Sequence, residues 1–141
     1  MPRVENGQNP ATGLGGLDNV KALKILEIDE QTSAAILGGF DYEIDGRLLH
    51  FSYDSFDQQN FSDGANNSIA ALMAGQPFAL EWNSYDESGA LVELELSAAQ
   101  FLELYQQGAC THKVTKMAQA RQRKLAVNDP ATDTPEKVAE I

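Results

Sequence analysis

Two stretches of the chain alternate between apolar and polar residues, the pattern of a β-strand with one buried face. In the first, the segments FDYEI and RLLHF flank Asp45-Gly46. This pair is preferred in two-residue type I′ turns, because both central residues need positive φ. Such a turn sets His50 opposite Asp41 and places the apolar residues on one face. The predicted cross-strand pairs are Ile44 with Arg47, Tyr42 with Leu49, and Phe40 with Phe51.

The second alternating stretch predicts another hairpin around the turn YDESG, with Phe78, Leu80 and Trp82 before it and Val92, Leu94 and Leu96 after it. Together the stretches predict an α+β fold, in which two β-hairpins form a four-stranded antiparallel sheet with intervening and C-terminal helices. The expected structural core combines the inward-facing strand residues with those of the helices: Phe40, Tyr42, Leu49, Phe51, Phe61, Leu80, Trp82, Leu94 and Phe101.

Helical spacing of apolar residues predicts helices over 18–37 and from Ser55 to about Ala74. Ser55 with Gln58, and Ser97 with Gln100, have the spacing of a capping box at a helix start. Gly108 is expected to interrupt the helix that follows Ser97. A basic helix is predicted over about 112–127, and Thr134 before Pro135 predicts a last short helix.

The chain has the length and composition of one globular domain, with 43% hydrophobic and 22% charged residues. Residues 1–17 are rich in Gly, Asn and Pro and predict a flexible N-terminal lead. We expect a compact α+β body over 18–108, and a basic helical arm with a short C-terminal helix over 109–141. No apolar run approaches the ~20 residues that span a bilayer, so we expect no membrane contact.

Charge is unevenly distributed along the chain, whose net charge is −11. Residues 25–112 hold fifteen acidic residues and one base, whereas residues 113–127 hold five bases and no acid. This balance argues against nucleic-acid binding, which needs clustered Lys and Arg. The arm could dock on its own body, on a second copy as a homo-oligomer, or on an acidic partner. The expected partner-binding residues lie on this arm: Lys113, Lys116, Arg121, Arg123, Lys124, Val138 and Ile141.

No catalytic or metal-binding constellation stands out. Asp41 begins a D-x-E-x-D-G run that resembles a calcium loop, but position twelve is Ser52 rather than the glutamate that such loops require. Cys110 and His112 could act as nucleophile and base only with a third group, which the sequence does not supply. GLGG at 13–16 lacks the spacing and the Lys of a phosphate loop. We therefore expect neither enzymatic activity nor a cofactor.

The order of the segments "GFDYEIDGRLLHFSYDSFDQQNF", "LEWNSYDESGALVELELSAAQFLELY", "ARQRKLAV" and "ATDTPEKVAEI" resembles a domain of unknown function from tailed phages and prophages, commonly encoded near tail-fibre genes. The resemblance covers residues 39–141. It implies a non-enzymatic tail-associated structural or tail-fibre assembly protein that docks on a phage tail or tail-fibre protein. The start of the chain lacks a secretory signal, so the expected location is the cytoplasm of the bacterial host during assembly, or the virion tail.

A second function class stays open beside this one, because unrelated functions share scaffolds. In that alternative the chain is a small enzyme or ligand-binding domain, and it needs a deep polar pocket. A docking protein instead needs a groove or an exposed apolar patch.

Overall fold

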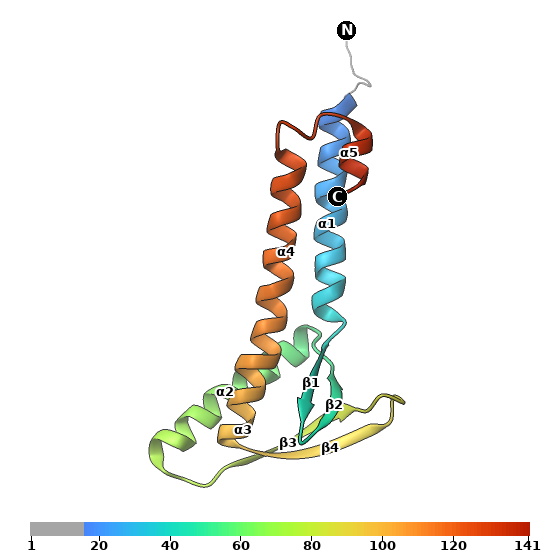
Figure 1. Ribbon diagram of the computed structural model, residues 1–141. Helices are drawn as coiled ribbons and strands as arrows, with labels where there is room; N and C mark the ends of the chain where they lie inside the picture. Colours follow the sequence, from blue (N-terminus) through green and yellow to red (C-terminus); the bar gives the residue numbers. More distant parts are fainter. Residues whose placement is uncertain (1–15) are drawn as a thin grey trace. The chain divides into compact units, whose positions relative to one another are not determined.

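The computed structural model describes residues 16–141, and its elements are labelled in Figure 1. The chain belongs to the α+β class, with one four-stranded antiparallel sheet in the order β1-β2-β3-β4. The strands are β1 (Phe40–Ile44), β2 (Arg47–Phe51), β3 (Ala79–Tyr85) and β4 (Leu91–Ser97). The helices are α1 (Gly16–Leu37), α2 (Ser55–Ala74), α3 (Ala98–Glu103), the π-helix η1 (Leu104–Cys110), α4 (Thr111–Asn128) and α5 (Pro135–Ala139).

The described residues form two compact units. We call residues 34–116 the sheet unit, and residues 16–33 with 117–141 the helical unit. Helices α1 and α4 each contribute residues to both. Of the predicted N-terminal lead, residues 1–15 lie outside the described residues, whereas Gly16 and Leu17 already belong to α1. The predicted boundary between residues 108 and 109 falls inside η1.

The predicted register of the first hairpin is confirmed at every pair, from Phe40 opposite Phe51 to Ile44 opposite Arg47. Asp45 and Gly46 have φ of 52° and 81°, as a type I′ turn requires. The two hairpins join where His50 of β2 pairs with Tyr85 of β3.

The core of the sheet unit is aromatic. Phe40, Phe51, Phe61 and Phe101 are buried, and so is Leu49, whereas the other expected core residues, Tyr42, Leu80, Trp82 and Leu94, are half-buried and pack against them. The indole of Trp82 lies with its centroid 4.7 Å from the Phe61 ring and 4.8 Å from the Phe101 ring. The second hairpin is thereby held against α2 and α3.

The helical unit has a small aliphatic core made of Ile28, Ala120 and Val127, with Ile25 and Ile141 packed against it. Val138 of α5 is also buried. Arg123 donates through Nη1 to Oε1 of Gln31 (2.8 Å), and Lys124 forms an ion pair with Asp29. A hydrogen bond and an ion pair therefore supplement a core that contains no aromatic residue.

Two predictions about helix ends are wrong. The N-cap of α2 is Asp54 rather than Ser55, and its capping partner is Asp57 rather than Gln58. The Asp54 carboxylate accepts from the Asp57 amide (2.8 Å), and the Asp57 carboxylate accepts from the Asp54 amide (3.1 Å). Gly108 does not interrupt its helix, because α3, η1 and α4 are continuous. The predicted capping box at Ser97 and the predicted helix start at Thr134-Pro135 are confirmed.

Candidate functional site: a groove beside an edge strand

The π-helix η1 packs directly beneath strand β1. Gly108 makes this approach possible, because a Cβ atom there would lie 2.8 Å from Cε2 of Phe40. The hydroxyl of Thr111 donates to the carbonyl of Gln106 (3.1 Å), which satisfies an acceptor at the end of the π-helix. π-helical turns occur frequently at functional sites, and residues of η1 line two hollows of the surface.

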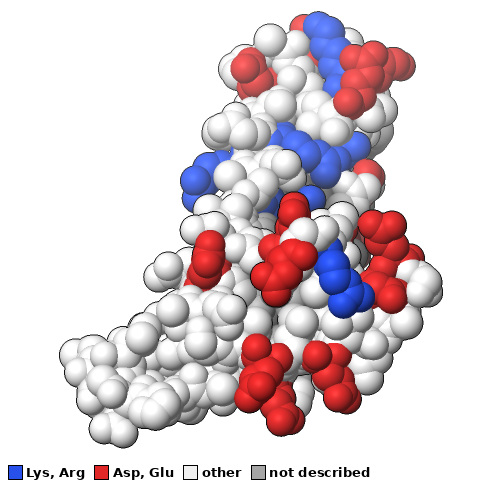
Figure 2. Space-filling model, turned by 60° about the horizontal axis from the view of Figure 1, so that its bottom comes forward, with Lys and Arg blue, Asp and Glu red and all other residues white. Residues whose placement is uncertain are grey.

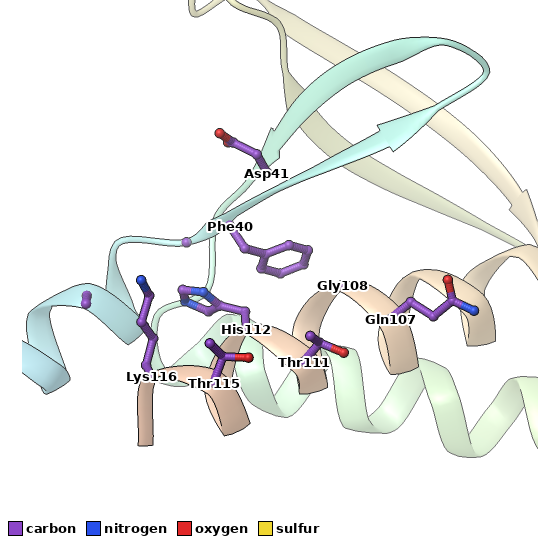
Figure 3. Close-up of a pocket in the computed structure, with 10 residues that line it drawn as sticks. Phe40, Asp41, Gln107, Gly108, Thr111, His112, Thr115 and Lys116 are labelled. Carbon is purple, nitrogen blue, oxygen red and sulfur yellow. The ribbon is translucent and has the colours of Figure 1, made fainter. Parts of the chain in front are cut away.

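A first hollow of about 450 Å³ lies between the start of β1 and the helix below it. Figure 3 shows Asp41 on the strand and Phe40 pointing from it toward the helix. The helical side is polar and is formed by Gln107, Thr111, His112, Thr115 and Lys116.

A second hollow of about 240 Å³ lies beside the rest of the same strand. It is lined by residues 42–45 of β1 and its turn, by Leu96 of β4, and by Gln100 and Glu103 of α3. Burial raises the pKa of the Tyr42 hydroxyl, and the neighbouring Glu103 carboxylate raises it further. The first hollow borders residues 39–41 and the second borders residues 42–45, and we call the two hollows together the β1 groove.

Strand β1 is an edge strand, because β2 is its one neighbour in the sheet. In an antiparallel pair, alternate residues turn their N–H and C=O away from the neighbouring strand. Ile44 and Arg47 flank a two-residue turn and form a hydrogen-bonded pair, so Asp41 and Glu43 belong to the non-hydrogen-bonded positions. Their backbone groups therefore face the free edge and the β1 groove.

Both histidines of the chain bind the segment that leads into β1. Nε2 of His112 donates to the carbonyl of Ile36, and Nε2 of His50 donates to that of Gly38, each at 3.1 Å. Nδ1 of His50 lies 2.8 Å from Oδ1 of Asp41, as the predicted pairing implies. Gly39 has φ of +90°, and a Cβ there would lie 2.3 Å from the carbonyl O of Phe51. The entry to the strand is fixed by these contacts.

A third hollow of about 410 Å³ lies on another side of η1. Tyr53, Tyr105, Cys110 and Lys113 line it, and Lys113 donates to Oε1 of Gln58 (3.1 Å). Burial raises the pKa of the Tyr53 hydroxyl, with smaller contributions from Cys110 and Tyr105. Cys110 lines this hollow while His112 lines the first one, so the structure does not bring this pair together as nucleophile and base.

The expected partner-binding residues of the arm have different surroundings. Arg123, Lys124, Val138 and Ile141 contact other residues of the helical unit. Lys113 and Lys116 line hollows of the sheet unit, whereas Arg121 is exposed on α4. The arm is therefore partly engaged within the chain, and the available part of α4 centres on Arg121.

Large apolar side chains surround Arg121 on the exposed side of α4. Met117 is 51% exposed and Leu125 is 60% exposed, and both lie four residues from Arg121 on the same helix face. We call these three residues the α4 stripe. The sequence patterns did not reveal the β1 groove. Its signal was a row of polar residues three or four apart, at positions 100, 103, 107, 111 and 115.

The sheet unit is strongly acidic, with twelve Asp and Glu and three Lys and Arg. Figure 2 shows acidic side chains spread over much of the face turned forward, together with several groups of basic ones. Across residues 16–141, no three His, Cys, Asp or Glu side chains gather closely enough to hold a metal ion. Within the same range, no helix is both long and apolar enough to cross a membrane.

Comparison with known proteins gives one match. A family model described as Domain of unknown function (DUF4376) matches residues 19–141. The match includes both units and all of the groove. No curated protein and no solved structure matches the chain.

Proposed function

Because the chain belongs to the family described as Domain of unknown function (DUF4376), whose description assigns no activity, we propose a function from the surfaces themselves: it is a non-enzymatic docking protein. In this proposal it acts with a bacteriophage tail, as a structural or tail-fibre assembly component, in the host cytoplasm or in the virion. The phage role rests on the resemblance of residues 39–141 to phage tail-associated domains. The docking role rests on the α4 stripe.

The α4 stripe supports docking because more than half of the surface of each of its two apolar side chains is exposed. Burying side chains of the size of Met117 and Leu125 contributes roughly 1.5–3 kcal/mol each when they become fully enclosed. Arg121 lies between them, and arginine is enriched at protein interfaces. A partner helix that presents apolar residues and one carboxylate would be complementary to this surface.

The test uses the full chain and the tail-fibre protein of the same phage, mixed and measured by size-exclusion chromatography with light scattering at two salt concentrations. Met117→Ser with Leu125→Ser should abolish the complex. The matched control, Leu48→Ser with Leu91→Ser, removes two leucines that are 49% and 52% exposed in the sheet unit, and it should leave the complex intact. A complex that survives the first pair contradicts the docking surface, and no complex for any form contradicts the tail role.

A ligand-binding function is the second candidate, favoured by the third hollow. Its lining offers a thiol, two phenols and one ammonium group within about 410 Å³. Screening small carboxylates by differential scanning fluorimetry tests it, and Lys113→Ala should remove any thermal shift that arises there.

A further inference from the structure

We propose that the β1 groove binds an extended, basic peptide segment of a partner protein, which pairs with β1 as a fifth strand. The inference rests on the proposed docking function and names a second contact surface for it. It is carried by the backbone of the edge strand, by the helical face beneath, and by the charges around both.

The backbone of β1 offers the hydrogen bonds that such a strand needs. Asp41 and Glu43 each present one N–H and one C=O at the free edge, as the register of the hairpin requires. Strand addition at an exposed edge gains its affinity from these main-chain bonds, and gains specificity from alternate side chains. An added strand would lie about 4.8 Å from β1, over the two hollows.

The helical face beneath the edge presents a row of polar side chains. Glu103, Gln107, Thr111 and Thr115 are exposed and lie four residues apart, on a helix whose Leu104–Cys110 segment is π-helical. Inward side chains of an extended peptide, which are about 6.7 Å apart, can donate to the amide, hydroxyl and carboxylate oxygens of this row.

The charges around the groove select a basic occupant. Asp41, Glu43, Asp45 and Glu103 are four acidic residues beside it, with Asp41 and Glu43 on the face of β1 that is turned away from the helix, while Lys116 stands at one end. Lys or Arg side chains at the outward positions of the peptide would lie opposite Asp41 and Glu43, where opposite charges stabilise cross-strand pairs. A second copy of β1 would place the same carboxylates opposite each other, and like charges there are destabilising. The charges on β1 therefore disfavour pairing between the β1 strands of two copies of the chain.

The test uses the full chain, labelled with ¹⁵N, and a capped heptapeptide of alternating Lys and Thr, with a peptide of alternating Glu and Thr as its control. We expect chemical-shift changes and slowed hydrogen exchange at the amides of Asp41 and Glu43 with the basic peptide. Raising the salt concentration should weaken the binding. Binding at other amides, equal binding of the acidic peptide, or no binding overturns the proposal.

Variants separate the backbone contribution from charge. Glu43→Pro removes the carboxylate together with one edge N–H that the hairpin does not use, and it should weaken binding about thirtyfold, which combines about tenfold for the hydrogen bond with about threefold for the charge. Glu43→Gln keeps that N–H and should weaken binding less, by about threefold. Glu95→Gln makes the same charge change on β4 and should leave affinity unchanged. If Glu43→Pro fails to fold, the comparison of Glu43→Gln with Glu95→Gln still tests the proposal. An equal loss of peptide affinity in these two variants would contradict binding at the β1 groove.

The experiments distinguish a failure of peptide binding at the β1 groove from a failure of the proposed docking function. If the fibre complex forms and depends on the α4 stripe while the peptide does not bind, only the groove is excluded. If the peptide binds at Asp41 and Glu43 while no fibre protein binds, the groove stands and the tail role fails.

Discussion

Glycine sets the closest contacts of the sheet unit. Gly64 of α2 is buried, and a Cβ atom there would lie 2.8 Å from two carbons of the Phe101 ring and 3.1 Å from Cδ2 of Leu80. The Phe101 ring has little room to move, because Phe61 stacks on it and the tilted Trp82 ring packs against it. The weak helix propensity of glycine is offset here by packing.

The Gly64→Ala variant should therefore lose about 1–2 kcal/mol of unfolding free energy, since overpacking exceeds the roughly 1 kcal/mol gained in helix propensity. Asn66→Ala is the matched control, because Asn66 is exposed on the same helix and the change should stabilise by about 0.5 kcal/mol. Urea titration of both variants measures the difference. A stabilised Gly64→Ala chain would contradict the tight contact.

Tyr53 should make stability depend on alkaline pH. Burial raises the pKa of its hydroxyl, so the folded chain holds this proton more strongly than the unfolded chain does. The resulting stability is present below the unfolded value of about 10, and it is lost as the pH rises through the folded value. Urea unfolding at pH 8 and pH 11 should show a smaller loss for Tyr53→Phe than for the parent. Tyr85→Phe, which leaves Tyr53 in place, should keep the full loss.

The start of α2 shows how two neighbouring sequence patterns compete. Asp54 with Asp57 and Ser55 with Gln58 have the same three-residue spacing, and both residue types can cap a helix. The structure uses the aspartates, while Gln58 donates to the carbonyl of Tyr53 (3.2 Å). Spacing predicted that the helix begins here, but could not choose between adjacent caps.

Removal of the observed cap gives a direct test. Asp54→Ala should lower the unfolding free energy by about 1 kcal/mol, because it leaves amide groups of the first turn without a partner. Ser55→Ala should change it by only a few tenths of a kcal/mol. Thermal unfolding followed by circular dichroism measures both, and a larger loss for Ser55→Ala would restore the sequence-based assignment.

Elements set by local rules were predictable, and those set by distant contacts were not. The first hairpin followed from a two-residue turn and strict alternation, so its register could be derived. Gly108 suggested a helix break because glycine has low helix propensity. The structure instead explains the glycine by the close approach of the Phe40 ring, which lies 68 positions away in the sequence. The β1 groove likewise joins residues 41–45 with residues 100–116, a pairing that no local pattern contains.

On the scale of the whole molecule, the two units differ in how they are stabilised. All eleven Phe, Tyr and Trp residues belong to the sheet unit. The helical unit depends on a few aliphatic residues and on the polar bonds of Arg123 and Lys124. A small apolar core supplies little stability, so the helical unit should unfold first.

Two spectroscopic probes can detect this order. Fluorescence of Trp82, the single tryptophan, reports on the sheet unit, whereas the circular dichroism of helices reports on both units. In a thermal scan, the dichroism should fall before the fluorescence shifts. Ile28→Ala should destabilise the helical unit by about 2–5 kcal/mol and advance only the first transition. Coincident transitions in the parent and in this variant would show one cooperative unit instead.

The π-helix η1 has a geometric consequence for the helix that contains it. In an α-helix, residues four apart differ by about 40° around the axis, so a row from Glu103 to Thr115 would wind through roughly 120°. A π-turn closes through a longer hydrogen-bonded ring and turns each residue by less, which counters this drift. The row can then run straight beneath a straight strand. The length of the Leu104–Cys110 segment, more than the identity of its side chains, thus determines how straight this row of side chains runs.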